Sequence, residues 1–215
     1  MGTGSFSVLI IESSDPEDFY DELLDGVAAQ SLLKVLGIKN WLKITLNKEH
    51  LKKALRHAKE HKPHVIHLSC HGRADNKGIV LANDDQIEWP KFAELFCEAK
   101  FAPQALVMSS CGGAAKGIDQ AFAAIHKRPG IIFGSRDDHG YGEYAVAWAL
   151  LYQRFKLKGL TVDSARTALR QINAVVSDAF LYRRWDSQKE KYLYYPGKQV
   201  KYAVKEVSNA GAPRW

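Results

Sequence analysis

Five short apolar runs, separated by longer segments with helical patterns, are the feature that most constrains the fold of this 215-residue chain. The first of them, Phe6 to Ile11, is almost entirely apolar, which is typical of a strand buried on both faces. Strands that alternate with helices predict a mainly parallel sheet covered on both sides, a three-layer α/β/α sandwich. The predicted strands are residues 6–11, 38–46, 64–70, 104–110 and 131–134.

Helix signals fill the segments between these runs. Asp15 is a suitable N-cap and Pro16 a suitable first residue for a helix that continues to Leu36, where Gly37 ends it. The other predicted helices are residues 48–61, 89–99, 118–127, 143–157 and 162–184, and residues 79–82 are predicted to form a short hairpin arm. From about residue 185 to residue 215 the chain is basic and aromatic, and within it Tyr192 to Gly197 fits either a last strand or the wall of a pocket.

Length and composition place the chain among ordinary globular proteins. Its length suits one domain over residues 1–215, and no apolar run approaches the roughly 20 residues of a membrane span. Three cysteines without a C-x-x-C spacing argue against a disulfide framework. We therefore expect a soluble protein of the cytoplasm that has no membrane partner.

The net charge of +6 comes from the second half of the chain, where residues 101–215 contain 17 Lys and Arg against 9 Asp and Glu. A basic surface of this kind is compatible with a solvated face or with an acidic partner. No nucleic-acid-binding motif accompanies it, so we expect no nucleic acid partner.

Two of the strands end in residues that can do chemistry. The segment Val65–Gly72 ends in His71 and Gly72, and the segment Ala105–Gly113 contains Cys111 followed by two glycines. The carboxyl ends of parallel strands meet at the same edge of a sheet. The sequence therefore predicts that an imidazole and a thiol meet at one edge.

A thiol beside an imidazole indicates nucleophilic catalysis. The histidine promotes formation of the thiolate and later protonates the leaving amine. The backbone N–H groups of Gly72 and Cys111 are candidate donors to an oxyanion. Taken singly, Cys111 also fits a small buried apolar residue and His71 a loop histidine bonded to a carbonyl group. The matched positions and the flanking glycines favour the catalytic interpretation.

Metal and nucleotide sites are the chemical alternatives. Zinc needs three or four convergent ligands, and Cys70 and His71 are neighbours in a strand whose side chains point to opposite faces. The glycine-rich segment 112–117 lacks the G-x-x-x-x-G-K-[ST] pattern of a phosphate-binding loop. We therefore expect neither a metal nor a cofactor. Cys70 and Cys97 are predicted to lie in the core, and His67 to pack or orient its neighbours.

The two motifs together resemble those of the CHAT peptidases, which belong to the caspase, separase and gingipain group. The segment Val65–Gly72 is similar to their strand-His-Gly motif and Ala105–Gly113 to their strand-Ser-x-Cys motif, and the resemblance extends over residues 5–197. It implies a caspase-like fold and a cysteine endopeptidase, with His71 as the catalytic histidine and Cys111 as the nucleophile. It also implies that the two side chains need not touch in the resting enzyme.

Small CHAT proteins resemble proteases of bacterial defence or programmed cell death that release a gasdermin-like pore former or a toxic protein. This resemblance implies a protein substrate and a regulatory protein as partners. Asp137 and Asp138 lie in the loop after residues 131–134. They fit a substrate pocket for a basic side chain; alternatively, either one caps the helix that follows or accepts hydrogen bonds from loop amides. The alternative function is a catalytically silent interaction module that keeps the same fold.

Overall fold

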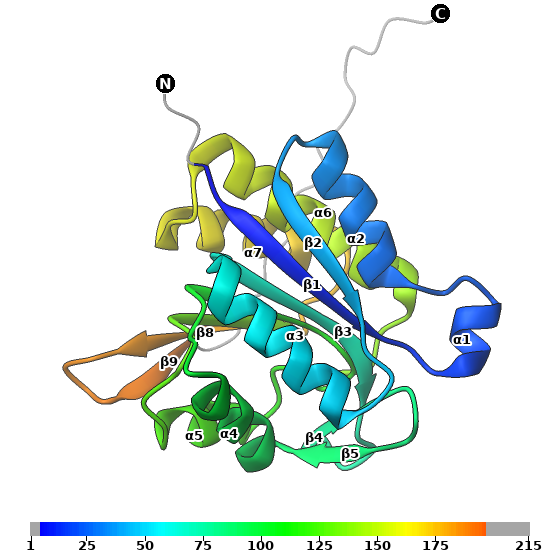
Figure 1. The fold of residues 1–215 in the computed structure, drawn as a ribbon. Coiled ribbons are helices and arrows are strands. Elements are labelled where there is room, and N and C mark those ends of the chain that lie inside the picture. Colours follow the sequence, from blue (N-terminus) through cyan, green and yellow to red (C-terminus); the bar gives the residue numbers. More distant parts are fainter. Residues whose placement is uncertain (1–4, 197–215) are drawn as a thin grey trace, which may run out of the picture.

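The computed structural model describes residues 5–196 and contains a nine-stranded sheet between two layers of helices (Figure 1). The main path of the sheet has the order β2-β1-β3-β6-β7-β8-β9; the first five strands are parallel, and β8 pairs antiparallel with both β7 and β9. The predicted mainly parallel α/β/α architecture is therefore confirmed. The bounds are β1 Ser7–Ser13, β2 Lys39–Ile44, β3 Val65–Gly72, β6 Ala105–Ser109, β7 Ile131–Ser135, β8 Phe180–Asp186 and β9 Lys191–Tyr195.

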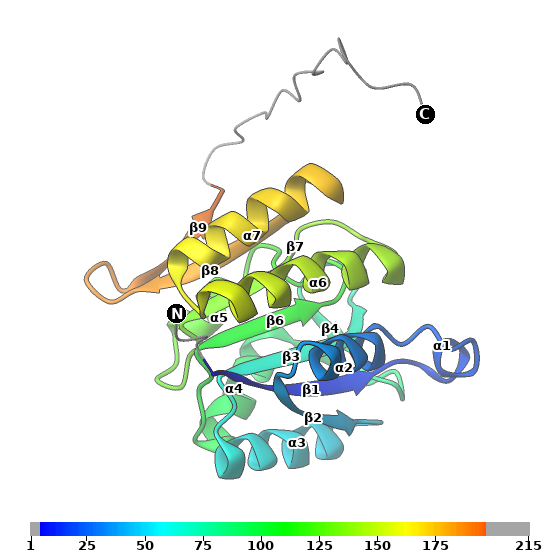
Figure 2. The same cartoon turned by 90° about the horizontal axis from the view of Figure 1, so that it is seen from above.

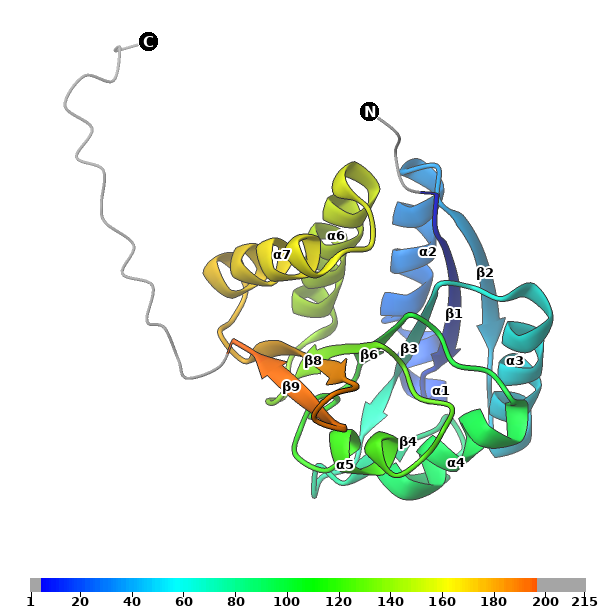
Figure 3. The same cartoon turned by 90° about the vertical axis from the view of Figure 1, so that its left-hand side faces the viewer.

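Helices cover both faces of the sheet, as Figures 2 and 3 show. One layer consists of α2 (Asp25–Val35), α6 (Tyr141–Lys158) and α7 (Val162–Val175), and the other of α3 (Lys48–His61), α4 (Trp89–Ala99) and α5 (Ile118–Ala123). Each layer has its own buried apolar cluster, so side chains of the central strands alternate between the two. Among residues 5–196, no helix combines the length and the apolar character that crossing a membrane requires.

The prediction of one helix from Pro16 to Leu36 is wrong. Asp15 caps a helix as predicted, but this helix, α1, covers only Pro16–Tyr20, and α2 begins separately at Asp25. The apolar side chains of Phe19 and Leu23 are 57% and 42% exposed and do not form a buried helix face. The break turns the chain at the carboxyl edge of the sheet, so α1 lies beyond that edge while α2 packs on the sheet (Figure 1).

The last predicted helix also extends too far. Helix α7 ends at Val175, and Phe180–Asp186 forms strand β8, which pairs with β7. Large aromatic and apolar side chains in this segment suit a strand, and the tertiary pairing decides its conformation. Tyr192 to Tyr195 belongs to strand β9, so the prediction of a last strand for that segment is confirmed. Residues 197–215 of the basic tail lie outside the described residues.

A small hairpin extends the end of β3. Strand β4 (Gly78–Val80) pairs with His71 and Gly72 of β3 and with β5 (Gln86–Glu88), as the predicted hairpin arm requires. The indole of Trp89 donates a hydrogen bond of 3.1 Å to the carbonyl oxygen of Asn76 in the intervening loop. The hairpin thus fixes the backbone that carries His71.

Candidate active site

The register of the sheet brings the two motifs to the same height. Strands β3 and β6 pair from Val65 opposite Ala105 to Ser69 opposite Ser109. His71 and Cys111 each lie two residues beyond this last pair, at the carboxyl edge of the sheet. The structure therefore places both predicted residues on neighbouring strand ends.

Helix α1 supplies a carboxylate to His71, which the sequence analysis did not foresee. The Nε2 atom of His71 lies 2.6 Å from Oδ2 of Asp18 and 3.3 Å from Oδ2 of Asp15. The hydroxyl group of Tyr141, at the start of α6, donates a hydrogen bond to the same oxygen of Asp18. The side chain of Asp18 is only 15% exposed, so its contact with the imidazole is largely shielded from water. Asp18 thus fixes the orientation of the ring.

Cys111 is half-buried, and its thiol faces the loop after β7. Burial is the main cause that raises the pKa of this thiol, and the carboxylate of Asp138, which accepts its hydrogen bond, raises it further. The backbone N–H groups of His139 and of Cys111 itself donate to the sulfur and act in the opposite direction. The balance favours a protonated, unreactive thiol in this form of the protein.

Asp137 and Asp138 differ in role. The side chain of Asp138 contacts the Cys111 thiol, whereas Asp137 contributes its backbone carbonyl, which accepts from the N–H of Gly112 at 3.4 Å. Neither residue caps α6, because its N-cap is Gly140, whose N–H donates to the carboxylate of Glu143 at 3.0 Å. The capping alternative for the two aspartates is therefore wrong.

Gly72 lies directly against the backbone of Cys111. A Cβ atom on Gly72 would come within 1.9 Å of the carbonyl oxygen of Cys111, so only glycine fits there. The two motifs are therefore in contact through their backbones. The roles of the Gly72 and Cys111 amides as oxyanion donors stay predictions, and the Cys111 amide faces its own sulfur in this form.

His67, Cys70 and Cys97 differ from His71 and Cys111 in their surroundings. Cys70 is buried on the face covered by α3 and α4, as expected, but Cys97 is only partly buried. Buried His67 has its Nδ1 atom 2.8 Å from the hydroxyl of Tyr152, and burial lowers its pKa to about 3. Neither Cys70 nor Cys111 belongs to the side-chain groups with metal-ligand geometry among the described residues, which are His57 with Glu60 and His61, and Asp15 with Asp18 and His71.

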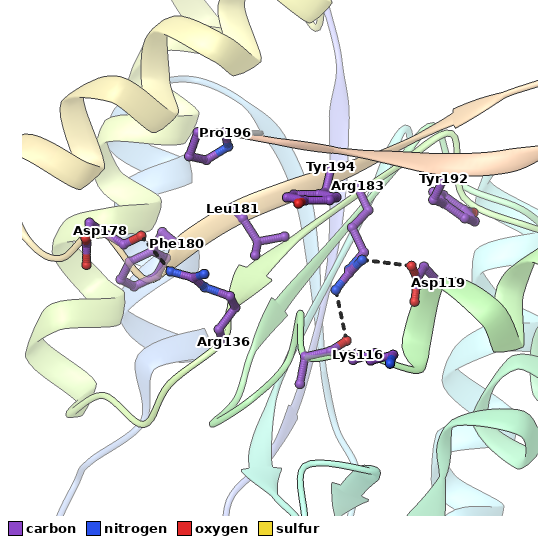
Figure 4. A pocket seen from close by; sticks show the side chains of 11 residues that line it. Lys116, Asp119, Arg136, Asp178, Phe180, Leu181, Arg183, Tyr192, Tyr194 and Pro196 are labelled. Carbon is purple, nitrogen blue, oxygen red and sulfur yellow. Dashed lines mark hydrogen bonds and ion pairs between the residues drawn. The ribbon is translucent and has the colours of Figure 1, made fainter. Parts of the chain in front are cut away.

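A cavity of about 720 Å³ lies beside the turn that follows Cys111 (Figure 4). The guanidinium group of Arg183 donates to the carbonyl oxygen of Ala114 at 2.9 Å and to the carboxylate of Asp119 at 2.8 Å. Arg183, which lines the cavity, thereby connects it to the turn after Cys111. The side chain of Tyr192 lines the same cavity, so β9 is also a pocket wall.

Comparison with known protein families agrees with this geometry. The CHAT domain profile matches residues 21–132, which include both His71 and Cys111. The chain belongs to the CHAT domain family. This is a family of caspase-like cysteine peptidases, and its members act on protein substrates.

A solved structure supports the fold independently of sequence. The chain is similar to a secreted C11 cysteine protease from Bacteroides thetaiotaomicron, called iotapain, with a TM-score of 0.57 and 10% sequence identity. The alignment covers 88% of this CHAT chain and 68% of the protease. No curated protein sequence matches the chain. The caspase-like fold is thus established by both the family and the structural neighbour.

Proposed function

We propose that this CHAT protein is a cysteine endopeptidase in which Cys111 attacks the scissile carbonyl and His71 transfers the proton. The observation that carries the proposal is the 2.6 Å contact between His71 Nε2 and Asp18, at the strand end next to that of Cys111. A carboxylate that accepts from one ring nitrogen leaves the lone pair of the other nitrogen free to act as a base. His71 is thereby prepared for general base catalysis.

The reaction then proceeds in two steps. The Nδ1 atom of His71 takes the thiol proton of Cys111, and the thiolate adds to the carbonyl carbon of the substrate. The imidazolium, stabilised by Asp18, gives this proton to the leaving amine as the peptide bond breaks. Water, activated by the same nitrogen, hydrolyses the acyl-enzyme and restores the thiol. The amides of Gly72 and Cys111 donate to the oxyanion.

In this proposal Asp138 keeps the resting enzyme inactive. Its carboxylate accepts a hydrogen bond from the thiol and raises the pKa of Cys111. A substrate with a basic residue before the scissile bond would pair with Asp138 or Asp137 and draw the carboxylate away from the sulfur. Substrate binding and thiol activation are coupled in this scheme.

The substrate in this proposal is a protein partner in the cytoplasm. By analogy with small CHAT proteases of bacterial defence and programmed cell death, cleavage releases a gasdermin-like pore former or a toxic protein. A regulatory protein would then control access to the site. Capture with the Cys111→Ala protein, followed by cleavage of the captured partner by the wild type, tests this part.

Cleavage of a diverse peptide library at neutral pH, under reducing conditions, tests the activity itself. Wild type should cleave, Cys111→Ala should not, and the matched control Cys97→Ala should cleave like wild type, since Cys97 lies on α4. Cleavage that survives in Cys111→Ala would refute the assignment of the nucleophile. A folded wild type that cleaves neither peptides nor a captured partner would favour the silent interaction module.

A further inference from the structure

Two buried carboxyl groups lie beneath the catalytic motifs. Glu12, in strand β1, and Asp25, the first residue of α2, are 1% and 4% exposed. A Cβ atom on Gly26 would come within 2.4 Å of Glu12 Oε2, so the backbone of α2 leaves no space between itself and this side chain. Buried carboxyl groups are costly unless hydrogen bonds or protonation compensate them.

Asp25 connects the two catalytic strands. One of its carboxylate oxygens accepts a hydrogen bond from the hydroxyl of Ser69 on β3, and the other from the hydroxyl of Ser109 on β6. Ser69 and Ser109 are opposite one another in the sheet, and each stands two residues before its catalytic residue. One side chain therefore spans the strand ends that carry His71 and Cys111.

Counting protons shows that this cluster holds one on a carboxyl group. The hydroxyl of Ser69 lies 2.9 Å from Oε1 of Glu12 and also against Asp25, but it has one proton to donate. The indole of Trp148 donates to Ser109 at 2.6 Å, so Ser109 gives its own proton to Asp25. If Ser69 also donates to Asp25, its contact with Glu12 is a hydrogen bond only when Glu12 is protonated. Burial and the charge of Asp25 raise the pKa of Glu12 to about 7, and burial also raises the pKa of Asp25, so the pair keeps a proton near neutral pH, which agrees with this count.

We propose that Asp25 is a positioning residue that aligns His71 with Cys111 through Ser69 and Ser109, and that a protonated Glu12 is required for this alignment. The inference rests on the proposed peptidase function. When Glu12 loses its proton, two negative charges share one buried site. Ser14 still donates to Oε1 of Glu12 at 2.6 Å, but Ser69 can donate to only one of the two carboxylates. The contact between Glu12 of β1 and Ser69 of β3 then weakens, two residues before His71.

The groups that surround the pair do not titrate in the relevant range. Burial raises the pKa values of Cys70 on β3 and of Tyr144 and Tyr152 on α6, so all three stay neutral up to about pH 9. Buried His67, with its pKa lowered to about 3, is also neutral. Replacing Glu12 leaves His71 and Cys111 in place. A pH transition that disappears in Glu12→Gln therefore belongs to the carboxyl pair.

The rate at which iodoacetamide alkylates Cys111 tests the proposal without any substrate. The rate is measured from pH 5.5 to 9 at 20 °C, with the modified cysteine identified by peptide mass spectrometry, in wild type, Glu12→Gln and the exposed control Glu94→Gln. We expect the ratio of the Glu12→Gln rate to the wild-type rate to be near one at pH 5.5 and at least threefold higher at pH 8.5, whereas Glu94→Gln matches wild type throughout.

A ratio that is constant with pH would overturn the proposal. Ser109→Ala provides a second variant, because it removes the hydrogen bond between Ser109 and Asp25. It should lower the rate of Cys111 alkylation at every pH and leave the midpoint of the pH transition unchanged. If peptide cleavage is found, Glu12→Gln should change kcat with the same pH dependence and leave KM unaltered. A protein that cleaves no peptide, but shows the expected alkylation ratio, would refute the proposed function and not the positioning role.

Discussion

Replacing Glu12 by glutamine should change how stability depends on pH. The ordinary pKa of 4.5 for this carboxyl group rises to about 7 in the folded protein. Each pKa unit corresponds to about 1.4 kcal/mol, so the difference amounts to about 3 kcal/mol. Because the folded state holds the proton more tightly than the unfolded chain, the free energy of unfolding falls as pH rises from 4.5 through 7. The glutamine amide, which cannot ionise, removes this loss.

Urea denaturation of wild type and Glu12→Gln at several pH values measures the effect. The free energy of unfolding of the variant minus that of wild type should increase by about 3 kcal/mol between pH 4.5 and pH 8.5. This comparison cancels any constant cost of the substitution and the titration of groups that do not interact with Glu12. The exposed control Glu94→Gln should give a flat difference. A difference for Glu12→Gln that stays within about 0.5 kcal/mol over the whole range would contradict a shared buried proton.

Three further substitutions test the site itself. Asp18→Asn should lower kcat/KM about 10²-fold or more, because an amide stabilises the His71 imidazolium poorly; a loss below about threefold in peptide cleavage would contradict the role of Asp18. Asp138→Asn should speed alkylation of Cys111 at pH 7, since it removes a negative charge that raises the thiol pKa, and an unchanged or slower rate would speak against the latent thiol. Gly72→Ala should destabilise the protein by about 2 kcal/mol and abolish cleavage, because its Cβ would overlap the Cys111 carbonyl; a wild-type melting temperature and activity would disprove this close contact.

The sheet and its catalytic edge could be predicted because the signals for them are local. Apolar runs mark the central strands, and parallel strands necessarily align their carboxyl ends, so the positions of His71 and Cys111 follow from the order of elements. Helix α3 has the predicted bounds, since Asn47 caps it and Lys62 ends it in a left-handed conformation just before Pro63. In these segments, local propensity and the final fold agree.

The parts that could not be predicted depend on contacts between distant residues. The sequence from Pro16 to Leu36 continues a helical apolar pattern across Leu23 and Leu24, and only the packing of α2 on the sheet separates it into two helices. Asp18 is distant from His71 in the sequence. The sequence shows it only as an acidic residue that suits the first turn of a helix, and nothing in that signal indicates its contact with an imidazole. Likewise, the segment from Phe180 forms a strand because β7 offers it a partner.

The break between α1 and α2 explains how one short segment serves the site twice. An uninterrupted helix from Pro16 would hold Asp18 and Asp25 about 10 Å apart along one axis, at 1.5 Å per residue. Both side chains would then belong to the same helix layer. With the break, Asp18 stays beyond the strand ends and binds His71, while Asp25 enters the core and binds Ser69 and Ser109. The helix N-terminus at Asp25 also favours its negative charge. The break therefore allows one carboxylate to bind His71 while the other connects the two strands that lead to His71 and Cys111.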